Sequence, residues 1–334
     1  MNRLRKISVL LAFTGLLLAT LLVGWYGFTR VLAAMFSVSL AGFAGLCGWQ
    51  MVLFTINGAA WDLTLPYLGP HLGWRRLGVM IWGRMVRESA ANCLPFSQVG
   101  GFIAGVRAVA SHGVGLRQAT ASTVVDVTAE FLAQIAFAAF GMLVVLAHGN
   151  GGTLAVPMAA GLMLALVLCA GFIGMQLRGV SPLARLSQLI ARSGFGFTQD
   201  RLGALQAELT ELYRSRRGVA CSFAAHILGW IGTGVGGWIA FRLLGVPIGL
   251  IDALAIEGLL HAVLATAFLV PGYAGVQEAA YAGIGALFGV PAEMALAVSL
   301  LRRARDIAVG IPILVIWQLI EMRRLAALEP VQEG

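Results

Sequence analysis

Long apolar segments recur along almost the whole chain, and they decide which kinds of fold it can adopt. A helix needs about 20 apolar residues to cross the hydrocarbon core of a bilayer. Only 11% of the residues are charged, whereas soluble domains carry about 25%. We therefore predict an all-α polytopic membrane protein, with one integral membrane domain over residues 1–334. The segments long enough to span are about 7–28, 36–60, 118–147, 154–177, 218–244, 250–270 and 293–320.

Three further apolar segments are too short or too interrupted to cross a bilayer comfortably. They lie at about 77–94, 96–110 and 277–289. Segments of this kind are tolerated inside a membrane only where protein buries them or where they line a cavity. We interpret them as half-helices or re-entrant segments.

One broken stretch occurs twice along the chain. Without any gap, Pro95–Glu130 aligns with Pro271–Asp306 at a constant offset of 176 residues. We therefore predict two repeats, over about 77–147 and about 250–320, each containing a broken or re-entrant helix. The identical pairs include Pro95 and Pro271, Gly113 and Gly289, Val114 and Val290, Ala119 and Ala295, and Ala121 and Ala297.

The positions of lysine and arginine predict how the repeats are oriented. Basic residues are abundant before the first span and at about 178–217, and they are absent from the loops at about 148–152 and 245–249. By the positive-inside rule, both termini are cytoplasmic. Two crossings separate the repeats, so the repeats run in opposite directions through the membrane. Inverted repeats with broken helices that meet near the bilayer midplane are typical of secondary transporters.

The net charge of +8 comes from these same basic residues at the ends of apolar segments. This placement favours contact with anionic lipid headgroups, and we expect no nucleic-acid partner. Leucines at helical spacing within 178–217 predict two short amphipathic helices that lie on the membrane surface or against the bundle. A segment of this length is too short for a catalytic domain, so any enzymology would occur within the membrane.

Ionisable residues inside apolar segments are the candidates for function, because each is costly in a bilayer unless it is paired or hydrated. Two interpretations stay open. The charges are structural ion pairs, or they line a hydrated midplane cavity whose half-helix N-termini and arginines hold an anionic headgroup. The candidate lipid-binding or transport residues are Arg87, Glu88, Asn92, Pro95, Arg107, Asp126, Glu130, Glu257, His261, Pro271, Gly272, Gly275, Glu278, Arg302, Arg303, Arg305 and Asp306, with Arg84 nearby.

Several roles follow from the spacing of these residues. Asp126 and Glu130 are four apart and share a helix face. At the common offset Asp126 falls opposite Arg302, so acidic groups of one repeat are expected to face basic groups of the other. Glu278 is a partner of a helix N-terminus, a counter-ion to the arginines, or a proton-coupling carboxylate.

No metal or cofactor site is expected from the sequence. Glu257 and His261 have spacing that suits a metal, but no third ligand is apparent. The histidine at position 226 is alone in a span, and we interpret it as a packing residue.

Two motifs resemble a known family. The resemblance is to the lysylphosphatidylglycerol synthase transmembrane-region family, a flippase-like membrane domain, and within it to the hopanoid-biosynthesis-associated membrane subfamily. Many members have Gly-Glu where this chain has Gly100-Gly101, so the usual carboxylate of the first motif is missing. The first motif is Leu94-Pro95, Gly100-Gly101, Arg107, Gly113, Ala119 and Ala121, and the second is Pro271-Gly272-x-x-Gly275-x-x-Glu278, Gly289-Val290 and Ala295 followed by an arginine-bearing helix.

The resemblance implies a multi-pass protein of the bacterial inner membrane that moves a hopanoid or a related lipid between leaflets. The partners would be that lipid or an anionic phospholipid, enzymes of the hopanoid pathway, and further copies of the chain. A transporter is favoured over an enzyme. The alternatives are a non-catalytic scaffold for hopanoid-pathway enzymes and an intramembrane headgroup transferase with Glu278 or Asp126 as its base.

Overall fold

The computed structural model of the chain describes residues 33, 36–65, 75–94, 97–149, 155–178, 199–267, 270 and 273–328, and no strand occurs among them. The predicted span at 7–28 lies outside the described residues, as do Pro95, Pro271 and Gly272. The helices are α3 (Leu40–Leu63), α4 (Arg75–Cys93), α5 (Ser97–Ala110), α6 (Leu116–Ala147), α7 (Ala155–Arg178), α9 (Gln199–Arg214), α10 (Arg216–Leu243), α11 (Leu250–Thr266), α12 (Val276–Leu287) and α13 (Ala292–Leu328).

The prediction of an all-α membrane protein is confirmed. Within the described residues, α3, α6 and α10 are long and apolar enough to cross a membrane. The predicted span at 250–270 is wrong in length, because α11 has 17 residues and extends only about 26 Å against a core of about 30 Å. The predicted span at 293–320 lies within α13, whose 37 residues include the charged sequence Arg302–Asp306.

Of the three segments predicted as half-helices or re-entrant segments, 77–94 corresponds to α4, which has 19 residues, and 96–110 and 277–289 correspond to the short helices α5 and α12. α5 has 14 residues and α12 has 12, so they extend about 21 Å and 18 Å and neither crosses a bilayer. α5 packs along α4, and α12 packs against α11 and α13. Both short helices are therefore held by protein, as backbone at membrane depth requires.

The helices α3–α6 and α10–α13 follow one another in the same order of lengths. α3 and α10 begin at Leu40 and Arg216, and α6 and α13 begin at Leu116 and Ala292, so both pairs are 176 residues apart. In the turn before each long helix, a glycine at the same offset has a positive φ, +99° at Gly113 and +71° at Gly289. Only glycine adopts this conformation readily, which explains these two identities.

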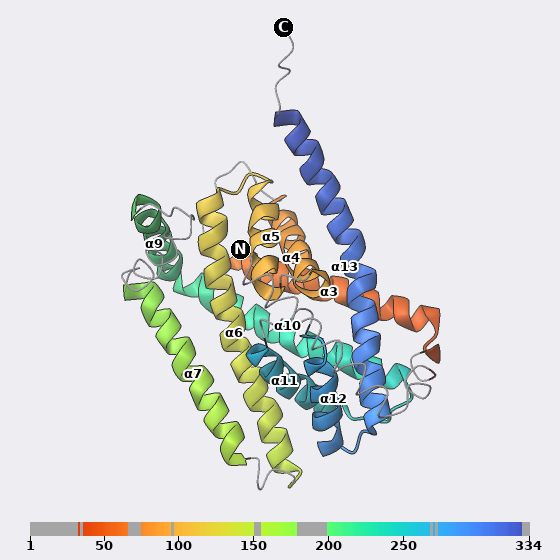
Figure 1. Cartoon of the computed structure of the whole chain (residues 1–334). Helices are drawn as coiled ribbons and strands as arrows, with labels where there is room; N and C mark the ends of the chain where they lie inside the picture. Colours follow the sequence, from red (N-terminus) through yellow and green to blue (C-terminus); the bar gives the residue numbers. More distant parts are fainter. Residues whose placement is uncertain are drawn as a thin grey trace.

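The two sets of helices also pack against each other in a reciprocal way. α3 lies against α10, α4 packs against the long helix α13, and α11 packs against the long helix α6. In Figure 1, α6 runs from the upper end of the bundle to the lower end, and α13 runs from the lower end to the upper end. The charged residues of both sets therefore meet inside one bundle.

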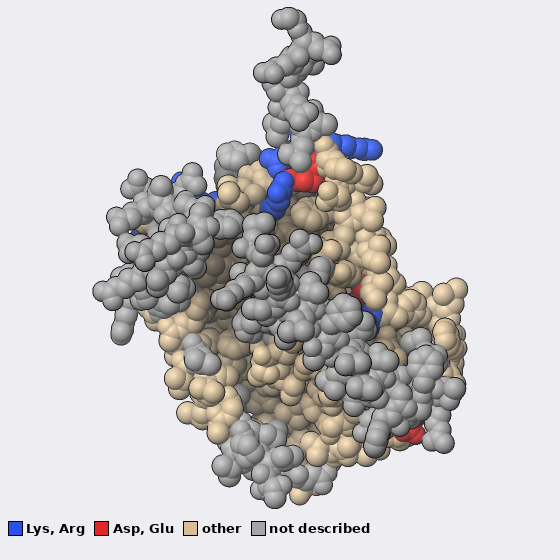
Figure 2. Space-filling model, viewed as in Figure 1, with Lys and Arg blue, Asp and Glu red and all other residues tan. Residues whose placement is uncertain are grey.

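The outer surface carries large apolar side chains, as expected for helices that face lipid. Met163 and Val167 of α7 and Ile311 and Val315 of α13 are exposed. Figure 2 shows that the described part of this face is almost free of charged side chains, which gather mainly at the end where α13 leaves the bundle.

The second amphipathic helix predicted within 178–217 corresponds to α9. Its Leu209 and Leu212 are buried and pack in one apolar cluster with Val125 of α6. This helix therefore lies against the bundle, which was one of the two predicted positions. The first predicted helix lies mainly in residues 179–198, outside the described part of the chain.

Candidate functional site

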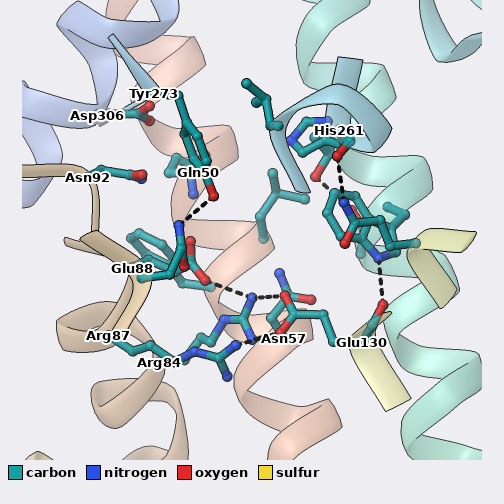
Figure 3. A pocket seen from close by; sticks show the side chains of 18 of the residues that line it. Gln50, Asn57, Arg84, Arg87, Glu88, Asn92, Glu130, His261, Tyr273 and Asp306 are labelled. Atoms are coloured by element: carbon teal, nitrogen blue, oxygen red, sulfur yellow. Dashed lines mark hydrogen bonds and ion pairs between the residues drawn. The ribbon is translucent and has the colours of Figure 1, made fainter. Parts of the chain in front are cut away.

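A cavity of about 490 Å³ lies inside the bundle, between the two sets of helices. Every helix of both sets, α3–α6 and α10–α13, contributes to its wall, and Figure 3 shows polar side chains from several of these helices pointing into it. Its volume is in the range of small-molecule sites, roughly 300–1,000 Å³. The polar and aromatic residues of the wall include Gln50, Asn57, Arg84, Arg87, Glu88, Asn92, Gln98, Phe102, Glu130, Phe131, Gln134, Trp230, Thr233, His261, Tyr273, Gln277, Arg302, Arg305 and Asp306.

The first charged cluster joins α4 to α6 at the wall of the cavity. Arg87 donates to Asp126 at 2.8 Å and to Glu130 at 2.6 Å. Arg84 donates to Glu130 at 2.9 Å and pairs with Glu88 of its own helix at 2.8 Å. Asp126 and Glu130 therefore share a face, as their spacing predicted, and that face is directed at the two arginines.

His226 of α10 belongs to this first cluster, although the sequence indicated only a packing role. Its ring Nε2 lies 2.9 Å from Asp126 Oδ1, and both side chains are buried. One ligand atom from each of Asp126, Glu130 and His226 lies within 4.8 Å of the others, close enough to hold a metal ion. Arg84 and Arg87 already neutralise the same carboxylates, so the charge that a metal would supply is already present.

The second charged cluster joins α11, α12 and α13. Arg302 donates to Glu257 and to the hydroxyl of Tyr281, and that hydroxyl donates to Glu257. All three side chains are buried. A Cβ at Gly237 of α10 would lie 2.3 Å from the Glu257 carboxylate, so the glycine leaves the space that this carboxylate occupies.

Glu278 fills two of the three roles that its sequence position left open. One carboxylate oxygen accepts the backbone N–H of Gly275 at 2.8 Å, at the start of α12. The other accepts from Arg303 at 2.8 Å. The spacing Gly-x-x-Glu in the second motif is therefore the spacing of a helix N-terminus and the carboxylate that caps it.

The expected pairing between the two repeats is wrong for the residues named. Asp126 pairs with Arg87 of its own set of helices, and Arg302 pairs with Glu257 of its own set. Each long helix therefore takes its partner from a shorter helix of the same set, α6 from α4 and α13 from α11.

The cavity brings together about half of the residues that the sequence analysis proposed. Arg107 is on the outside instead, where its half-exposed side chain pairs with Glu321 of α13. Asp126, Glu257, Gly275, Glu278 and Arg303 are not among the lining residues. The proposed residues in the wall are Arg87, Glu88, Asn92, Glu130, His261, Arg302, Arg305 and Asp306.

Apart from Asn92, the uncharged polar residues of the wall were not among the candidates from the sequence. Gln50 and Asn57 are seven residues apart in an apolar segment, so they lie on one face of α3 and both line the cavity. Because they are isolated polar residues in an apolar segment, they could have been identified from the sequence as candidates for the wall. Gln98, Gln134 and Gln277 are further carboxamides in the wall.

The close packing of α4 and α5 accounts for the missing carboxylate of the first motif. A Cβ at Gly101 would lie 2.6 Å from the backbone carbonyl of Arg87 and 2.9 Å from Ala91. A glutamate at this position would therefore push α5 away from α4. In this chain the carboxylates of the helices α3–α6 that line the cavity come from α4 and α6, not from α5.

The comparisons with known proteins agree with this arrangement at the level of a family. No protein among the curated proteins compared with the chain matches it. The family model described as the transmembrane region of lysylphosphatidylglycerol synthase matches residues 9–313. The chain therefore belongs to the lysylphosphatidylglycerol synthase transmembrane-region family.

Proposed function

We propose that the chain is a flippase-like lipid transporter, which carries the headgroup of a lipid through the cavity while the acyl chains stay in the bilayer. The observation that carries this proposal is the cavity itself. It is a polar space inside a bundle with apolar outer faces, and both sets of helices supply its wall. Membership of the family supports a membrane lipid as the ligand.

The proposal includes two inverted repeats that rock against each other about the cavity. The shared offset of 176 residues between helix starts, the reciprocal packing of α4 on α13 and of α11 on α6, and the opposite directions of α6 and α13 support this part. In transporters built this way, movement of one repeat against the other opens a fixed site to each side in turn.

The cargo and location are proposed from the motif resemblance. The cargo would be a hopanoid or a related lipid, and the protein would lie in the bacterial inner membrane with both termini in the cytoplasm. The carboxylates that an intramembrane transferase would use as a base do not favour that alternative, because Asp126 and Glu278 are buried and already paired.

A leaflet-resolved assay in reconstituted vesicles tests the transport proposal. Lipids with a fluorescent group are placed in both leaflets, and a membrane-impermeant quencher removes the signal of the outer leaflet. We expect vesicles with the protein to lose signal beyond the outer leaflet, and protein-free vesicles to keep it. The variant Gln318→Met, which alters an exposed residue of α13 outside the cavity, should match the wild type. Equal loss with and without protein for every lipid would contradict transport and favour a scaffold.

A further inference from the structure

The arginines of the cavity wall are already committed to carboxylates. Arg84 and Arg87 donate to the first cluster, Arg302 donates to Glu257, and Arg305 donates to Asp306 at 2.6 Å. These four arginines face five carboxylates, namely Glu88, Asp126, Glu130, Glu257 and Asp306. The formal charge of the cavity wall with its direct partners is therefore −1.

This balance argues against an anionic headgroup, which was one of the two interpretations that the sequence left open. A phosphate is held most strongly by arginines that are free to donate two parallel hydrogen bonds to it. A phosphate bound by Arg84, Arg87 or Arg302 would have to displace Asp126, Glu130 or Glu257 from that arginine. The displaced carboxylate would then be left buried and uncompensated, which is strongly unfavourable.

Three carboxamides of the wall are uncommitted. Within the described residues, the side chains of Gln50, Asn57 and Asn92 make no hydrogen bond to the protein, and all three are at the cavity. Gln98 donates to the hydroxyl of Tyr273 at 2.8 Å and Gln134 donates to a backbone carbonyl at 2.7 Å, so each of them keeps a carbonyl oxygen for a further donor. Figure 3 shows Gln50, Asn57 and Asn92 around one space.

Carboxamides and hydroxyl groups are complementary in hydrogen bonding. A carboxamide has two donors and an acceptor oxygen, and a hydroxyl group both donates and accepts. Flat aromatic side chains, among them Phe131 and Tyr273, form other parts of the wall and suit the apolar C–H faces of a sugar ring or a polyol. Sites of this composition orient a ligand by a few polar contacts between apolar surfaces.

We propose that the cavity binds a neutral, polyhydroxylated headgroup, a sugar or a polyol, in preference to a phosphate. Gln50, Asn57 and Asn92 are the residues that recognise its hydroxyl groups. The buried ion pairs hold the wall in place. This inference rests on the proposed function for the ligand being a lipid, and it adds the chemical class of its headgroup.

Binding to the purified full-length protein tests the headgroup class. Four probes share a dioleoylglycerol anchor and differ in the headgroup, which is glucosyl, glycerophosphate, trimethylammonium or absent. We expect the glucosyl probe to bind about tenfold more tightly than each of the others. Asn57→Leu should weaken glucosyl binding roughly 3- to 10-fold, the effect of one neutral hydrogen bond. Gln50→Met together with Asn57→Leu should weaken it by more than about tenfold, whereas Gln318→Met should not change it.

Three results would overturn the inference. They are glycerophosphate or trimethylammonium binding as tightly as glucosyl, no headgroup binding better than the bare anchor, and full glucosyl affinity in a folded double variant. The thermal unfolding temperature of each variant shows whether it is folded. In the vesicle assay, movement of the phosphate probe alone would contradict this inference and keep the transport proposal. Selective glucosyl binding without movement of any lipid would contradict the transport proposal alone.

Discussion

The two charged clusters occupy equivalent places in the two sets of helices, but their charges are exchanged. In the first, the arginines are on the shorter helix α4, and the carboxylates that they bind on the neighbouring helix, Asp126 and Glu130, are on the long helix α6. In the second, the carboxylate is on the shorter helix α11 and the arginine is on the long helix α13. The two sets therefore share the position of an ion pair between a shorter helix and the long helix. They do not share which of the two helices carries the arginine.

The clusters also differ in their access to the cavity. In the first, the side chains of Glu88 and Glu130 are 26% and 16% exposed, whereas Glu257 of the second is fully buried. Water can reach the first cluster through the cavity. We infer that the first cluster shapes the binding site and that the second mainly fixes α11 and α13 together.

The largest expected effect is on the second cluster. Arg302→Met leaves the Glu257 carboxylate buried without its cation, and we expect a loss of about 3–5 kcal/mol in the free energy of unfolding. The thermal unfolding temperature of the purified protein measures this. Adding Glu257→Gln removes the unpaired charge and should restore most of the loss. If Arg302→Met alone is as stable as the wild type, the second cluster does not stabilise the fold.

The first cluster should respond less in stability and more in transport. Glu130→Gln leaves Arg84 paired with Glu88 and Arg87 paired with Asp126, so we expect a loss of about 1.5–3 kcal/mol, the value of hydrogen bonds to a charged group. Lipid movement in vesicles should fall severalfold in protein that is still folded. Full transport by Glu130→Gln would remove the functional distinction between the clusters.

Glu278 should have a smaller and more local effect. Glu278→Gln removes the charge at the start of α12, and we expect a loss of about 1–2 kcal/mol, typical of a helix cap with its charge. Hydrogen exchange of backbone amides should rise in α12 while α6 stays protected. The control is Glu293→Gln in the first turn of α13. An equal rise in hydrogen exchange in α12 and α6 would mean that Glu278 is not a local cap.

The outer ion pair between α5 and α13 should have the smallest effect. The side chain of Arg107 is 55% exposed, so Glu321→Gln leaves a hydrated arginine and should change the free energy of unfolding by only about 0–1 kcal/mol. That change should diminish further at high salt, because exposed pairs are screened. A larger, salt-independent loss would place Arg107 with the buried clusters.

The positions of the helices and turns along the chain could be predicted from the sequence, because they depend on local sequence patterns. The short helices α5 and α12 follow from the length of their apolar segments, and the turns at Gly113 and Gly289 follow from a shared residue. The cap formed by Glu278 could be anticipated for the same reason, since its partner is three residues away.

The partners of the buried charges could not be predicted, because they depend on how helices far apart in the chain are packed. Asp126 and His226 are 100 residues apart, and Gln134 donates to the backbone of a residue 127 positions away. Spacing along one helix indicates which residues share a face, but not which helix that face meets. The carboxamides of α3 were missed for a further reason, since the analysis selected ionisable residues.

The most direct test of the central claim is to locate the headgroup in the protein. A lipid with a photoactivatable group on its headgroup is bound, irradiated, and mapped by mass spectrometry of the labelled peptides. The account predicts labels on wall residues such as Phe102, Phe131 and Trp230. Labels confined to outer residues such as Met163 and Val315 would contradict it.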